Sequence, residues 1–127
     1  EAARCGVQAL ERSAAGGDAQ ALERLAQSLH GPAPVTDPSV RANLWAALVR
    51  LSTEPAAREG AARALDAAVA GALPESDRIA LAEALALFGT ADDRPLLDRL
   101  AQPPSPRFDD ARRFFETRLA AGASPAR

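Results

Sequence analysis

The feature that most constrains the fold is a repeat inside the chain. Residues 22–27 recur as residues 97–102, a shift of 75 positions, with one glutamate replaced by aspartate. At about half that distance, six positions within residues 39–51 match positions within 76–88, at a shift of 37. Two independent shifts in a ratio of about two to one indicate a repeated unit of roughly 37 residues rather than chance similarity in an alanine-rich chain.

The apolar spacing within the repeat predicts that each unit is a pair of helices. Leu22, Leu25, Ala26 and Leu29 recur at the three- and four-residue intervals of one buried helix face. No run alternates apolar and polar residues in the manner of a strand, so the expected fold is all-α. Breaks at Gly and Pro divide one domain, residues 1–127, into three pairs and one extra helix, at about 5–31, 37–73, 76–102 and 107–121.

Capping residues mark the helix ends. Asp18 is expected to cap the second helix, and Asp37 the third, with Pro38 in its first turn. Ser52 and Thr53 are expected to end the third helix and to cap a fourth that starts near residue 54.

Helical phase predicts which side chains face inward. Leu48, Leu85 and Phe88 fall on the buried faces of their helices, whereas Trp45 lies about 100 degrees from the inward position and points to the flank. Arg41 is expected to bond carbonyls or acids where two repeats meet.

Composition excludes several classes of protein. The chain is 47% hydrophobic and 25% charged, which is typical of a soluble globular protein and leaves no run long enough to span a membrane. A net charge of −2 gives no broad positive field for nucleic acid or anionic lipid, so neither is an expected partner. The compartment stays open, with the cytoplasm slightly favoured over the periplasm.

The residues of the middle pair resemble those of a known family. Residues 37–41 read Asp-Pro-Ser-Val-Arg and precede an apolar helix face, a short turn and Glu-Pro at 54–55. Residues 88–97 supply a glycine turn, an acidic cap and an early proline. These features resemble bacterial HEAT repeats. The resemblance implies an α-solenoid, a right-handed superhelix whose second helices line a concave surface. The third pair keeps only the arginine of the Asp-Pro-Ser-Val-Arg run. Among repeat families, tetratricopeptide repeats are the second choice.

No pattern in the chain indicates catalysis. His30 and the acidic pairs 92–93 and 109–110 lie at helix ends, where their charges stabilise the helix dipole. Cys5 is a single cysteine without a neighbouring ligand motif. We therefore expect no enzyme activity, no cofactor and no metal, and assign no catalytic, cofactor-binding or metal-binding residue.

One pattern points to a binding surface. Arg24, Arg63 and Arg99, here called the arginine column, occupy equivalent exposed positions of the three second helices. They either keep the helices soluble or bind carboxylates of a partner with bidentate contacts. Packing between repeats is the first interpretation of Trp45, and an anchor for a partner is the alternative.

These features predict a non-enzymatic scaffold that presents a helical surface to a protein partner or to another region of its own longer chain. The alternative function is a helical-repeat protein that binds nucleic acid or serves as a glycosylase-like or lyase-like enzyme subunit. That alternative requires a basic or aromatic groove, which one tryptophan, no tyrosine and an acidic total disfavour. The oligomeric state is left open.

Overall fold

The protein is all-α. The computed structural model describes residues 2–71, 73–102 and 104–122, and for residues 2–5 the backbone alone. In these ranges the chain forms seven α-helices and one short 3-10 helix, without a strand. The helices are α1 (Ala2–Ala15), α2 (Ala19–His30), α3 (Pro38–Leu51), α4 (Arg58–Ala70), α5 (Glu75–Phe88), η1 (Ala91–Asp93), α6 (Arg94–Leu100) and α7 (Pro106–Gly122).

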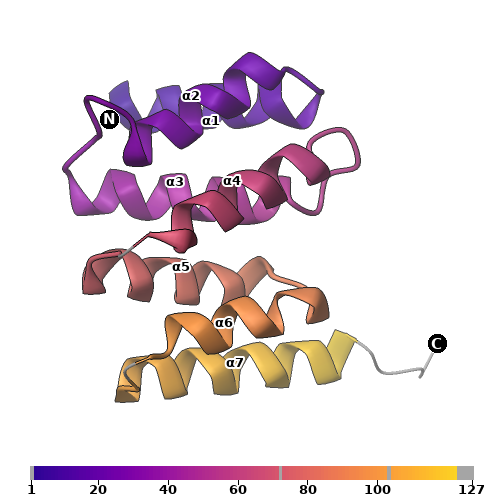
Figure 1. Ribbon diagram of the computed structural model, residues 1–127. Coiled ribbons are helices and arrows are strands. Elements are labelled where there is room, and N and C mark those ends of the chain that lie inside the picture. Colours follow the sequence, from indigo (N-terminus) through magenta and orange to yellow (C-terminus); the bar gives the residue numbers. More distant parts are fainter. Residues whose placement is uncertain (1, 72, 103, 123–127) are drawn as a thin grey trace.

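The odd-numbered helices form a row in which each packs on the next, from α1 through α3 and α5 to α7. Helix α2 packs on α1 and α3, α4 packs on α3 and α2, and α6 packs on α5. In Figure 1, α2, α4 and α6 lie on the viewer's side of that row, and the chain runs from top to bottom. None of the described helices combines the length and apolar character needed to cross a membrane.

Two of the three capping predictions are confirmed. The Asp18 carboxylate accepts hydrogen bonds from the first amides of α2, and the Asp37 carboxylate accepts one from Ser39 of α3. The prediction for the fourth helix is wrong at its start. The Ser52 and Thr53 hydroxyls donate back to carbonyls of α3 and so cap its end, and no side chain in the described residues caps the start of α4. A turn over 54–57 follows, and α4 begins at Arg58.

The core lies between the two sets of helices. Leu48 and Leu85 are fully buried, as their phase predicted. Phe88 is 36% exposed, so its predicted inward orientation is wrong. Its ring lies under the guanidinium of Arg50, 4.9 Å from ring centre to Cζ, and Arg50 forms a bidentate ion pair with Glu11 of α1. Phe88 therefore packs at the edge of the core, where a cation covers one of its faces.

Candidate protein-binding surface

The arginine column lies on α2, α4 and α6. Arg24, Arg63 and Arg99 are each the sixth residue of their helix, and all three are exposed. The three helices that carry these equivalent exposed positions lie on one side of the row of odd-numbered helices (Figure 1).

A glycine allows α2 and α4 to approach closely. A Cβ atom added at Gly60 would lie 2.6 Å from Cδ2 of Leu22, closer than real Cβ contacts. The absence of a side chain at Gly60 lets the Leu22 side chain rest on the backbone of α4. This contact helps to fix the spacing between the helices that carry Arg24 and Arg63.

The side chains of the arginine column make fewer contacts with other elements than do most other described arginines. Among the described residues, Arg63 is paired only with Glu59 of its own helix, at 3.9 Å between Nη1 and Oε1, and both side chains are at least 73% exposed. Within the described ranges, no ion pair and no hydrogen bond engages the side chain of Arg24 or Arg99. Most other described arginines bind acids or carbonyls of another helix or loop: Arg41, Arg50, Arg78, Arg94, Arg107, Arg112 and Arg118.

Arg118 illustrates the structural use of arginine. Its guanidinium donates to the carbonyl oxygens of Leu85, Ala86 and Gly89 at 2.6–3.2 Å, and so caps the last turn of α5 from α7. Such bonds join neighbouring helices and leave the cation unavailable to a partner.

Trp45 is not part of an accessible surface. Its side chain is 1% exposed, so the flank of α3 to which it points is covered, and the residue is removed as an anchor for a partner. Its Nε1–H donates to Oδ1 of Asp77 at 3.2 Å, so the indole is held between α3 and α5. Packing between repeats is therefore the role that the structure gives this residue.

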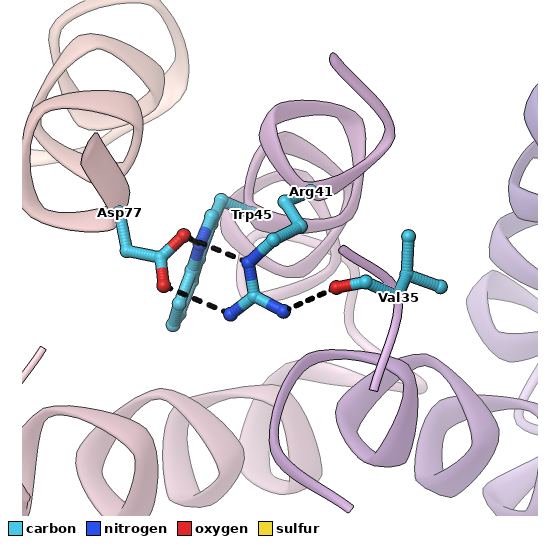
Figure 2. Close-up of polar contacts among 4 residues, drawn as sticks. All are labelled: Val35, Arg41, Trp45 and Asp77. Carbon is cyan, nitrogen blue, oxygen red and sulfur yellow. Dashed lines mark hydrogen bonds and ion pairs between the residues drawn. The ribbon is translucent and has the colours of Figure 1, made fainter. Parts of the chain in front are cut away.

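Arg41 joins the same cluster, as the sequence predicted for the junction between repeats (Figure 2). Its Nε and Nη2 donate to the two carboxylate oxygens of Asp77 at 2.9 and 2.8 Å, and Nη1 donates to the carbonyl of Val35 at 2.8 Å. The side chains of Arg41 and Asp77 are only 17% and 6% exposed. This planar, bidentate pair locks α3 to α5 and to the loop before α3.

The remaining polar residues noted in the sequence lie at helix ends. His30 is the last residue of α2 and is exposed. The Asp93 carboxylate accepts the backbone N–H of Thr90 at 2.8 Å, which supplies the acid half of a capping box. Burial raises the pKa of Asp93, the bond from Thr90 lowers it, and the charge of Asp92 adds to the rise. Asp109 and Asp110 lie in the first turns of α7.

Among the described side chains, those of residues 6–71, 73–102 and 104–122, no three His, Cys, Asp or Glu residues come together as metal ligands do. Cys5 lies in α1, and its side chain is outside the described part of the structure.

An apolar groove between α5 and α7 was not expected from the sequence. It has a volume of about 340 Å³, and Leu87 and Phe114 on its walls are 51% and 53% exposed. Ion pairs at its edge neutralise the nearby charges, including Arg107 with Glu83. Helical phase alone could not reveal the groove, because the groove forms only when α5 and α7, which are distant in the sequence, pack together.

Comparisons with protein families, curated proteins and solved structures give no match to this chain.

Proposed function

We propose that this chain is a non-enzymatic binding module, built as a short HEAT-like solenoid, that holds an acidic segment of a protein partner along α2, α4 and α6. The 37-residue repeat supports the solenoid arrangement, as does the row of odd-numbered helices with α2, α4 and α6 on one side.

The observation that carries the proposed function is that internal contacts engage the arginine column less than they engage most other described arginines. Contacts with other helices or loops engage most of the described arginines of the odd-numbered helices, whereas the side chains of Arg24 and Arg99 stay unengaged within the described ranges and Arg63 has one long, exposed pair. An exposed pair of this kind contributes little and is easily exchanged for another carboxylate. Guanidinium groups recognise carboxylates through two parallel hydrogen bonds, so a row of them suits a segment rich in Asp or Glu.

The test compares two triple variants of equal charge. In the first, Arg24, Arg63 and Arg99 are changed to glutamine; in the control, the exposed Arg12, Arg107 and Arg113 of α1 and α7 are changed in the same way. Both immobilised variants and the wild-type chain are exposed to lysate of the source organism, and captured proteins are quantified by mass spectrometry.

We expect the control to retain what the wild type captures and the column variant to lose it, with unchanged circular dichroism and melting temperature. Capture by the wild type should also fall as salt is added, because exposed charge pairs are screened. Equal capture by both variants at low salt would refute the column as the binding site. Tight, salt-sensitive binding of labelled duplex DNA would instead favour the nucleic-acid alternative.

A further inference from the structure

A second cavity brings one member of the arginine column together with an arginine of the other helix row. It lies between the end of α4, the first turns of α5 and the end of α6, and its volume is about 290 Å³. Its polar side chains are basic or neutral, and its apolar side chains are aliphatic: Arg78, Arg99 and Gln102, with Val69, Leu73 and Leu100.

Among the described residues, no acidic side chain lines this cavity. No acidic side chain of those residues lies within ion-pair distance of Arg78 or Arg99. The two undescribed positions nearest in sequence, 72 and 103, are alanine and proline, which bear no side-chain charge. Guanidinium groups stay protonated at every physiological pH. The cavity therefore holds two positive charges without a negative charge on its walls.

Arg78 itself is only partly engaged. Its Cζ lies 5.1 Å from the ring centre of Phe108, and its Nε donates to the carbonyl of Leu100 in a long bond of 3.3 Å. Within the described ranges, neither terminal nitrogen makes a hydrogen bond. The side chain is thus held in place by an aromatic ring, while the donors that match a carboxylate stay unused.

The arginine at the equivalent position one repeat earlier shows what a side chain at the position of Arg78 binds. Arg41 and Arg78 are the fourth residues of α3 and α5, at the shift of 37. The third residue of the next helix in the row faces each of them, and it is Asp77 for Arg41 but Phe108 for Arg78. The carboxylate that neutralises Arg41 is therefore missing one repeat further on.

We propose that this cavity binds a carboxylate group of a protein partner, which takes at Arg78 the place that Asp77 takes at Arg41. Arg99 supplies the second cation, and Val69, Leu73 and Leu100 contact the aliphatic part of the same residue. The inference rests on the proposed function, because it names one point at which the acidic partner is held. The carboxylate belongs either to an acidic side chain or to the end of a chain.

The test is a nuclear magnetic resonance titration that follows the arginine Nε–Hε signals of the intact chain. The probes are blocked triglutamate, acetyl-Ala-Leu with a free carboxylate, its amide, and inorganic phosphate. Stronger binding of triglutamate assigns the carboxylate to a side chain, whereas stronger binding of acetyl-Ala-Leu assigns it to a chain end; either result supports the cavity. Equal binding of acetyl-Ala-Leu and its amide, with none of triglutamate, would overturn it, as would tighter binding of phosphate than of any carboxylate.

Variants of the residues that line the cavity show whether the probe binds there. Gln102→Glu places a competing acid beside the two arginines, and we expect it, like Arg99→Gln, to weaken carboxylate binding about tenfold or more. Gln27→Glu is the matched control, because Gln27 occupies the equivalent position of α2 outside the cavity and should leave binding unchanged. Arg78→Lys keeps the charge but lacks the planar fork, so it should also bind more weakly. If Arg78→Lys does not fold, the Gln102 and Arg99 variants still decide the question.

A double variant separates this inference from the proposed function. Arg24→Gln with Arg63→Gln leaves the cavity intact. If the double variant captures as much partner as the wild type while the probes bind Arg78 and Arg99, the result supports the cavity as a carboxylate site and refutes the arginine column as the binding surface. If the double variant loses capture while no carboxylate probe shifts the Arg78 or Arg99 signals, the result refutes the cavity as a carboxylate site and supports the arginine column as the binding surface.

Discussion

Replacing Asp77 by alanine should destabilise the protein strongly. The carboxylate accepts two hydrogen bonds from Arg41 and one from the indole N–H of Trp45, and the side chain is 6% exposed. Its removal leaves a largely buried cation and an unsatisfied indole donor. Removing one partner of a buried ion pair costs about 3–5 kcal/mol. Arg41 is 17% exposed and keeps its bond to the carbonyl of Val35, so we expect a loss of about 2–4 kcal/mol.

The assay is urea denaturation followed by circular dichroism, for Asp77→Ala, Arg41→Gln and the double variant. Because each single variant leaves one group of the pair without its partner, the double variant should be less destabilised than the sum of the two. A coupling of about 1.5–3 kcal/mol is expected for a buried, bidentate pair.

An exposed bidentate pair provides the control. Arg94 and Glu116 have the same geometry at 2.7 Å, but their side chains are 46% and 41% exposed. Glu116→Ala should therefore destabilise the protein far less than Asp77→Ala does. A loss below about 1 kcal/mol for Asp77→Ala, or coupling near zero, would show that the cluster does not lock α3 to α5.

Three further predictions concern the core, a cap and a titration. Leu48→Ala and Leu85→Ala, both at fully buried positions, should each cost about 2–5 kcal/mol in thermal melts, and a loss under about 0.5 kcal/mol would contradict the packing. Asp37→Ala should cost about 1 kcal/mol, since it removes the acceptor for the Ser39 amide in the first turn of α3; an unchanged melting midpoint would argue against the cap. The hydrogen bond from Arg94, aided by its charge and by that of Arg112, lowers the pKa of Glu116, so any stability that this pair gives is present above the ordinary glutamate pKa and is lost as pH falls through the lowered value. Arg94→Gln should return that pKa toward its ordinary value in a titration followed by nuclear magnetic resonance, and an unmoved pKa would contradict the pair.

Local chemistry in this chain was predictable from the sequence. The caps Asp18 and Asp37 bind amides within three residues, so the sequence around them contains all the information needed. The inward Leu48 and Leu85 follow from helical periodicity in the same way.

Contacts between distant helices were harder to predict. The sequence placed Arg41 at a junction between repeats, but its partner Asp77 lies 36 residues away, and no local pattern marks that pairing. Helical phase placed Trp45 on the flank of α3 and left packing between repeats and a partner anchor both open; only the contact with α5 shows that this flank is covered. Phe88 shows the opposite error, because Arg50 covers a ring that was expected to lie inside the core.

Arginine footprinting with phenylglyoxal, read by mass spectrometry on the free chain and on the chain bound to its captured partner, shows directly whether the arginine column holds the partner. We expect Arg24, Arg63 and Arg99 to react in the free chain and to become protected in the complex, while the exposed Arg12 stays equally reactive in both. Unchanged reactivity of the arginine column, with protection instead at Arg107 beside the groove of α5 and α7, would contradict this expectation.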